Sequence, residues 1–199
     1  MRKIGLSLVL VGILGATSAV AEESGFFIGG QLGFGNTKTQ IEFSSNMAAF
    51  TAEPREHTIS KSYYGFIGGY KQFFTPAFGA RYYAVAEFNY TKINANADAL
   101  YNFLSNDALD FGAFAGLSLG YVDYSGIVSG FDMGINAGLR AVIAQKHSIE
   151  LYSRFSTIEQ EKTEELLGYD VPGLGYASSE MITKLKQPYQ IGLRYTFSF

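Results

Sequence analysis

The sequence contains no cysteine and no tryptophan, and only 17% of its 199 residues are charged. Without cysteine, the chain has no disulfide framework, no thiolate metal site and no cysteine nucleophile. Its net charge of −3 excludes the basic face with which a nucleic-acid-binding protein contacts phosphates. Disorder is excluded as well, because a chain that is 16% aromatic and 47% hydrophobic is too apolar to stay unfolded.

Long apolar runs are also missing, except at the start of the chain. A basic pair precedes an apolar run from Ile4 to Ala16, and Ala19-Val20-Ala21 has the small-x-small pattern of a cleavage site. We therefore expect residues 1–21 to be a cleaved secretory signal peptide and residues 22–199 to form one mature domain. An uncleaved N-terminal anchor is the alternative, but the run is short for a membrane span of ~18 apolar residues.

The C-terminal segment alternates apolar and polar residues with a period of two. From Tyr189 to Phe199 the odd positions are apolar and the even positions are polar or small. Because successive side chains of a strand point to opposite faces, this predicts a strand with one apolar and one polar face. The pattern repeats in segments of about 10–13 residues, the length with which a tilted strand crosses a bilayer. The predicted strands are Gly25–Asn36, Tyr63–Phe74, Ala80–Tyr90, Ile93–Phe103, Leu109–Tyr121, Phe131–Ile143, Ser148–Thr157 and Tyr189–Phe199.

These strands predict an all-β fold, an eight-stranded antiparallel transmembrane up-and-down β-barrel in the cell outer membrane. Eight is the smallest usual strand number for such a barrel, and closure is required because an open edge in lipid leaves backbone groups unpaired. Short periplasmic turns alternate with longer extracellular loops in this class. The predicted turns are Thr75–Phe78, Ser105–Ala108 and Gln145–His147, and the outer connectors are Asn36–Ser62, Thr91–Lys92, Asp123–Gly130 and Ile158–Gln187.

Tyrosine and phenylalanine gather near the predicted strand ends. Such residues form the aromatic girdles that mark both membrane interfaces of an outer-membrane barrel. The predicted girdle residues are Tyr63, Tyr64, Phe73, Phe74, Tyr90, Tyr101, Phe103, Tyr121, Tyr124, Tyr152, Tyr195 and Phe199.

The polar faces of the predicted strands carry five acidic and five basic residues. An eight-stranded barrel has an interior just wide enough for side chains to fill it, and buried charges are costly unless they are paired. We therefore expect ion pairs that plug the lumen, with a narrow ion path as the alternative. The predicted lumen-lining residues are Lys71, Arg81, Glu87, Asp98, Asp110, Asp132, Arg140, Glu150, Arg154 and Arg194.

The sequence predicts no catalytic residue, no metal site and no cofactor. His57 belongs to an outer connector and His147 to a periplasmic turn, so the two histidines cannot share a site. A lipid-modifying hydrolase that uses His57 with a serine of the same connector is kept as an alternative. The acidic residues between 158 and 186 lack the spacing of a calcium loop and are assigned to a solvated face.

Five short strings resemble the Helicobacter outer membrane protein family, the Hop and Hor group. The resemblance implies an outer-membrane β-barrel whose aromatic C-terminal strand is read by the barrel-assembly machinery, in a family that includes porins and host-cell adhesins. The large extracellular domain of the adhesins has no counterpart here, and no catalytic residues come with the resemblance. The strings are Gly69–Phe74, Arg81–Tyr83, Ala99–Phe103, Gly138–Arg140 and His147–Leu151.

These features together predict a structural or surface-interaction role through the extracellular segments 37–61 and 158–186. The expected partners are outer-membrane lipid and lipopolysaccharide, the barrel-assembly machinery during biogenesis, and a host or extracellular ligand, but not nucleic acid. The alternative is a narrow porin-like channel for ions or small solutes.

Overall fold

The computed structural model describes residues 22–46, 52–89, 91–106, 108–172 and 175–199. The predicted signal peptide lies outside these residues. Among the described residues, no helix is long and apolar enough to span a membrane. The chain forms nine strands: β1 (Gly25–Ser45), β2 (Ala52–Phe73), β3 (Phe78–Phe88), β4 (Thr91–Ser105), β5 (Leu109–Asp123), β6 (Ser129–Ile143), β7 (His147–Ser156), β8 (Gln160–Val171) and β9 (Gly175–Ser198).

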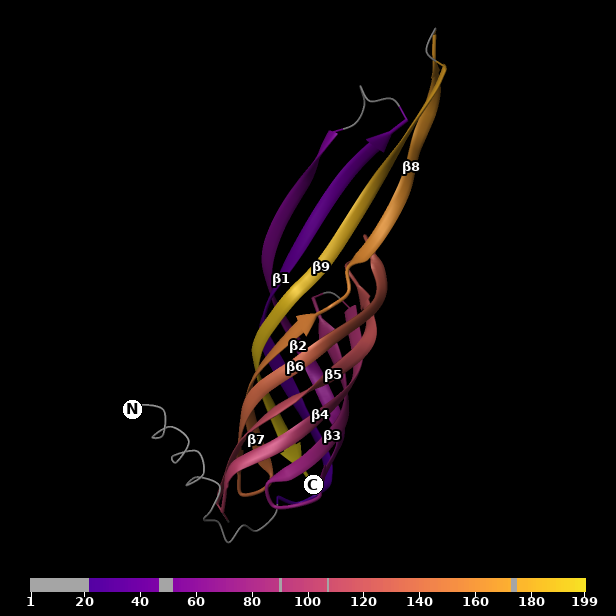
Figure 1. Ribbon diagram of the computed structural model, residues 1–199. Coiled ribbons are helices and arrows are strands. Elements are labelled where there is room, and N and C mark those ends of the chain that lie inside the picture. The colour runs from indigo at the N-terminus through magenta and orange to yellow at the C-terminus, as the bar shows by residue number, and fades with distance from the viewer. Residues whose placement is uncertain (1–21, 47–51, 90, 107, 173–174) are drawn as a thin grey trace, which may run out of the picture.

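Eight of these strands close into an antiparallel ring (Figure 1). Neighbours in sequence pair from β1 to β7, β7 pairs with the lower half of β9, and β9 pairs with β1. Closure gives every strand of the ring two neighbours, which satisfies backbone hydrogen bonds inside a bilayer. The predicted eight-stranded barrel is thus confirmed.

The two long connectors that we predicted as loops are largely strands. β1 continues to Ser45 and β2 begins at Ala52, while β8 pairs with the upper half of β9. β1 also pairs with β9 from Lys38 to Ser45. The order β2-β1-β9-β8 therefore forms a four-stranded sheet, here called the extension, that projects beyond one side of the barrel (Figure 1).

The sequence carried only a weak sign of the extension. Alternation continues beyond Asn36, with Thr37, Thr39 and Ile41 on one face and polar residues on the other. We predicted a loop because neither face is consistently apolar, whereas a strand that has left the bilayer needs no lipid-facing side. The prediction was wrong because it used the bilayer length as the limit of the strands.

A change of register separates the barrel from the extension on β9. Arg154 of β7 pairs with Gln190, and Gln160 of β8 pairs with Leu185, so β7 and β8 follow each other along the same neighbour. The pairing with β1 also shifts in this interval, which contains Pro188. A proline fits there because it has no N–H for a regular ladder.

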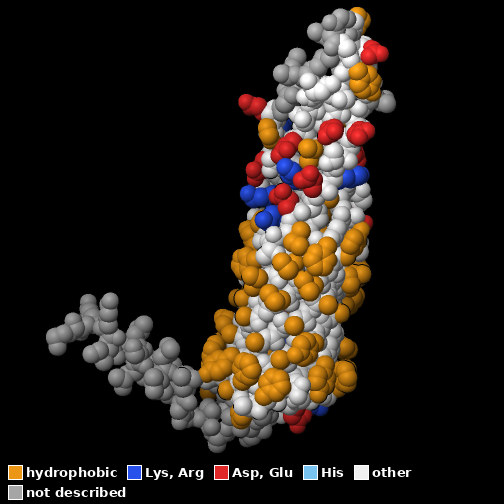
Figure 2. All heavy atoms as spheres, turned by 45° about the vertical axis from the view of Figure 1, so that its right-hand side comes forward, with side chains coloured by type: hydrophobic (Ala, Val, Ile, Leu, Met, Phe, Trp, Pro, Cys, Tyr) orange, Lys and Arg blue, Asp and Glu red, His pale blue; other side chains and the backbone are white. Residues whose placement is uncertain are grey.

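The outside of the ring is an apolar belt. Leu32, Leu193 and Leu151 are cross-strand neighbours on this surface and remain 60%, 52% and 48% exposed. On the face seen in Figure 2, hydrophobic side chains cover the lower part of the molecule, and charged side chains gather above them. Contiguous apolar surface of this extent marks contact with lipid rather than water. The ring is therefore the part that spans the outer membrane.

Several residues predicted for the aromatic girdles point into the barrel. Tyr63, Tyr124 and Tyr152 are buried, and the hydroxyls of Tyr63 and Tyr152 lie 2.6 Å apart. The prediction failed because we chose these residues by their nearness to strand ends and ignored the face on which they lie. Phe73 packs partly buried against an interior cluster, and Tyr90 lies outside the described residues. Tyr64, Phe74, Phe103, Tyr121, Tyr195 and Phe199 are exposed on the outside.

The inward-facing glycines give a first prediction. A Cβ added to Gly116 would lie 2.1 Å from the carbonyl oxygen of Ala97, whereas the nearest atom to one added to outward-facing Gly30 would be the Gly65 oxygen, at an ordinary contact distance of 3.6 Å. Gly116→Ala should lower the free energy of unfolding by about 1–3 kcal/mol through overpacking, and Gly30→Ala by less than about 0.5 kcal/mol. Urea titration of the refolded variants, followed by circular dichroism, measures both; equal values would contradict a tightly filled lumen.

Candidate functional site

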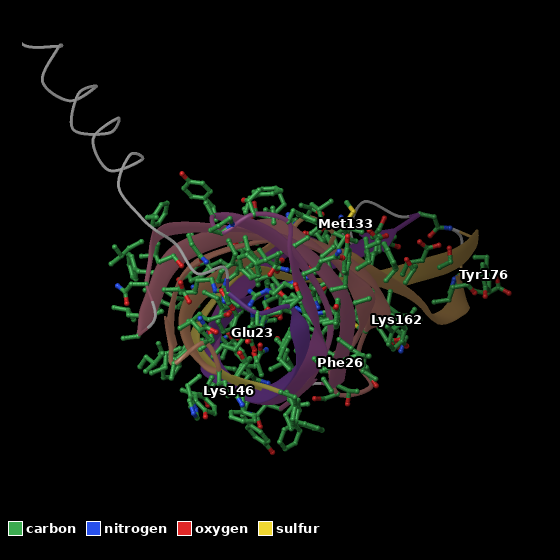
Figure 3. The ribbon with its side chains drawn as sticks, turned by 90° about the horizontal axis from the view of Figure 1, so that it is seen from below. Glu23, Phe26, Met133, Lys146, Lys162 and Tyr176 are labelled. Carbon is green, nitrogen blue, oxygen red and sulfur yellow. The ribbon has the colours of Figure 1, made fainter. Side chains whose placement is uncertain are left out.

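The ten charged residues that we predicted to line the lumen all lie inside the ring with buried side chains. Side chains fill the space enclosed by the strands when the barrel is viewed from below (Figure 3). Register explains their pairing, because residues directly opposite on neighbouring strands share a face. Arg140, Glu150 and Arg194 are such neighbours across β6, β7 and β9, and Arg81 faces Asp98 across β3 and β4.

The middle of the lumen is built around Glu150. Its two carboxylate oxygens lie 2.5 Å from Nη1 of Arg81 and 3.1 Å from Nη1 of Arg194. Arg81 also contacts Asp98 at 2.9 Å, and the Tyr83 hydroxyl donates to the same Asp98 oxygen at 2.9 Å. Charge-assisted hydrogen bonds of this kind are the strongest that side chains make. They offset the large cost of taking these charges out of water.

The lower end of the lumen is closed by Glu22, which lies just before β1. Its Oε1 accepts hydrogen bonds from Nζ of Lys71 at 2.7 Å and from Nη2 of Arg140 at 2.6 Å. Nearby, Ser105 donates to the buried carboxylate of Asp110. Sequence reasoning missed Glu22 because it precedes the first alternating segment. The ten predicted charges already balanced, five acids against five bases, so their count gave no signal for Glu22.

The upper lumen is built around Asp132. One of its oxygens lies 3.1 Å from Nζ of Lys92 and 2.8 Å from Nη2 of Arg154, and Ser156 donates to the other. We placed Lys92 in a short outer connector, and this was wrong, because β4 starts at Thr91 and turns Lys92 inward. The alternation of Lys92, Asn94 and Asn96 continues the polar face and could have revealed it.

Glu87 connects the middle and upper groups. Its two oxygens accept from Gln31 at 2.8 Å and from Gln190 at 2.9 Å. Gln190 and Gln187 also accept hydrogen bonds from Lys92. Since Gln31 also accepts a hydrogen bond from Arg194, hydrogen bonds and ion pairs connect Glu150 to Asp132. The lower group adjoins them through Arg140, which stands opposite Glu150 in register.

The charges of this network balance within the described residues. Adding Glu22 and Lys92 to the ten predicted residues gives six acids and six bases, all buried. The cavity that adjoins Arg140, Glu150 and Arg81 measures about 10 Å³, which is the space of about one water molecule. The network thus fills the interior with paired charges instead of leaving a wide aqueous path.

An apolar cluster lies above the upper group of charges. Val122 lies near the end of β5, Tyr124 and Val128 come from the β5–β6 connection, and Leu185 comes from β9 where the extension begins. All four side chains are buried. Ions and small solutes that enter from outside would first meet this apolar cluster, which adds to the barrier of the charges below it.

The outward face of the extension is charged. Lys38 contacts Glu56 at 3.2 Å, and Lys184 contacts Glu42 at 3.0 Å. The hydrogen bond with Glu42 raises the pKa of Lys184, so this ammonium stays charged at neutral pH. Lys38, Glu56 and Lys184, together with Lys186, line a surface pocket of about 300 Å³. The extension therefore presents a solvated, polar surface above the belt.

The two histidines lie apart, as their positions in the sequence implied. His57 is exposed on β2 in the extension and pairs in register with Thr39. His147 begins β7 at the lower end, where its Nδ1 lies 2.8 Å from the Tyr195 hydroxyl. Within the described residues, no hydrogen bond joins His57 to a serine or a carboxylate, and no group of three or more His, Asp or Glu residues is arranged to hold a metal ion.

Comparison with known proteins finds solved structures of low similarity and no family. No family model matches the chain, and no curated protein matches it. The outer membrane protein OprG from Pseudomonas aeruginosa is similar at a TM-score of 0.45 and 14% identity, over 90% of this chain and 99% of that one. The outer membrane protein AlkL is similar at a TM-score of 0.44 and 12% identity, over 92% of this chain and 95% of that one. Ail of Yersinia pestis, in complex with the heparin analogue sucrose octasulfate, is similar at a TM-score of 0.36 and 12% identity, over 87% of this chain and 99% of that one.

Proposed function

We propose that this protein is a non-conducting outer-membrane barrel that presents the extension at the cell surface for interaction with a partner. The observation that carries the proposal is the lumen, in which, among the described residues, all six buried bases pair with four of the six buried acids, while Glu87 and Asp110 accept hydrogen bonds from glutamine and serine side chains. Such a network suits a rigid support better than a conduit, because an ion would have to displace existing ion pairs to pass.

The shape of the molecule supports the same proposal. Three strands of the ring, β1, β2 and β9, continue far beyond the apolar belt, where β8 joins them, although a bilayer needs only about 9–11 residues per tilted strand. β1 has 21 residues and β9 has 24, while β3 has only 11. The additional length lies on one side and is exposed, as expected of a surface that meets a ligand in the external medium.

Within this proposal, outer-membrane lipid and lipopolysaccharide surround the belt, and the partner of the extension is a host or extracellular molecule. Residues 1–21 act as a secretory signal peptide, and the barrel-assembly machinery inserts the mature domain 22–199. Five strings of the sequence resemble the Helicobacter outer membrane protein family. On this resemblance we propose that the protein is a small member of that family, without the large adhesin domain.

Planar-bilayer recording tests the closed lumen directly. The refolded mature protein should be silent at moderate voltage, because the cavity beside Arg140 and Glu150 has room for about one water molecule. Correct folding is checked first by circular dichroism and by heat-modifiable migration in gels.

Frequent open-channel steps of uniform size from a folded sample would contradict this proposal. They would instead favour the alternative of a narrow channel lined by the charged residues. Fused, protein-free lipid vesicles provide the blank, and an unrelated open porin provides the positive control.

A His57→Ala variant that alters lipid A acylation would favour the hydrolase alternative.

A further inference from the structure

The extension has two side edges, one formed by β2 and the other by β8. Along residues 52–62, β2 pairs with β1 alone, and beyond Gln160 β8 pairs with β9 alone, among the described residues. In a paired edge strand, every second residue directs its N–H and C=O away from the sheet. Both edges therefore offer backbone groups to a further strand.

The β2 edge is protected against such pairing. It contains Pro54, and its register with β1 shifts between Ile41 and Phe43. Proline and bulges are the usual means by which natural sheets prevent the addition of a strand. The β8 edge has neither over residues 160–166, where the register with β9 is regular. This segment is exposed from Glu161 to Leu166 and lies on the outer side of the extension (Figure 1).

The charge of the β8 edge indicates what kind of strand it accepts. β8 contains four acids and one base, for a net charge of −3, whereas residues 52–62 of β2 carry two of each. Lys162 is already paired with Glu164 at 2.7 Å. Glu161 and Glu165 lie on the opposite face, where Glu161 stands across from Lys184 of β9 and Glu165 stands directly across from Glu180. Like charges that face each other across strands are destabilising.

We propose that the β8 edge, residues 161–166, binds an extended, positively charged peptide segment of an extracellular protein by β-strand addition. Main-chain hydrogen bonds supply affinity in this mode, and alternate side chains supply specificity. Cationic side chains of the added strand face Glu161 and Glu165 and relieve the repulsion between Glu165 and Glu180. A second copy of this chain is a poor occupant, because its own β8 brings the same negative charge. The inference rests on the proposed function and names the partner class of the extension.

Fluorescence anisotropy with the mature barrel in nanodiscs tests this inference. The probe is a short labelled peptide of alternating lysine and valine, which places all its ammonium groups on one face of a strand. We expect binding that weakens as salt is added. Glu161→Gln/Glu165→Gln should weaken it by about three- to tenfold, since exposed charge pairs each contribute modestly. The matched control Glu53→Gln/Glu56→Gln, which removes the same charge from the β2 edge, should leave it unchanged.

A second measurement separates strand addition from attraction between charges. The same peptide, N-methylated at every residue, keeps its charge but has no backbone donors and should not bind. Hydrogen exchange should show new protection of amides within 161–166 when the unmodified peptide is present.

Equal binding of the N-methylated peptide, or an equal loss of binding in the β2 control, would overturn the inference, as would failure of the unmodified peptide to bind. A silent barrel that binds no peptide removes this inference and leaves the proposed function standing. A conducting barrel that binds the peptide contradicts the proposed function and leaves the binding of a strand at the β8 edge standing.

Discussion

Replacing Glu150 with glutamine is expected to lower the free energy of unfolding by about 3–5 kcal/mol. Glutamine keeps the shape of the side chain but removes the charge that neutralises Arg81 and Arg194, whose guanidinium nitrogens lie 2.5 and 3.1 Å from the carboxylate. The site is buried, and removal of one member of a buried ion network leaves uncompensated charge in a medium that solvates it poorly. Urea titration of the refolded protein in detergent, followed by circular dichroism, measures the change.

Two further variants show whether the loss comes from unpaired charge. Glu164→Gln breaks the ion pair with Lys162, in which both side chains are 47% exposed. It should lower the free energy of unfolding by less than about 1 kcal/mol. Glu150→Gln/Arg194→Met should recover part of the loss, because Arg81 then keeps Asp98 as its partner. If Glu150→Gln is as stable as the wild type, the lumen must be well hydrated, and the channel alternative gains support.

Leu193→Arg is expected to destabilise the folded barrel by about 2–4 kcal/mol. Leu193 lies on the outside of β9, between Leu32 of β1 and Leu151 of β7, and is 52% exposed to the surroundings of the ring. A charge on the lipid face of a membrane barrel costs this much near the bilayer midplane and much less near the interface. Refolding titrations into lipid vesicles measure the effect in the relevant environment.

The matched control lies on the same strand and the same outward face but in the extension. Ile182→Arg is opposite Glu42 of β1, above the belt in a region that carries Lys184 and Glu42 on its surface. It should cost at most about 1 kcal/mol. Equal losses for the two variants would mean that the lipid-facing surface has been assigned to the wrong part of β9.

The period-two pattern was sufficient to predict the ring. A strand that crosses a bilayer must show lipid one apolar face, so the order of residues such as Tyr189, Ile191 and Leu193 records the environment directly. The inward direction of Arg194 and Glu150 follows from the same alternation. The prediction therefore depended on local sequence alone, and it holds for eight of the nine strands.

The extension shows where this kind of prediction stops. Above the membrane, neither face of a strand has to be apolar, so Lys38, Thr39 and Gln40 are as typical of a loop as of a strand. What makes them a strand is the partner that the closed ring supplies, since β1 and β9 already lie side by side where they leave the lipid. Pairing between segments more than a hundred residues apart is not encoded in the pattern of either one.

The sequence by itself determined the class of fold, the lipid-facing surface and the inward direction of the charges, because alternation is a local property and the bilayer imposes it on every strand. Only the tertiary structure decided which charges pair. Glu22 reaches Lys71 and Arg140 from outside any predicted strand, and Lys92 reaches Asp132 from a predicted connector. These contacts depend on the register and curvature of the closed ring, which bring distant residues together and which no single segment specifies.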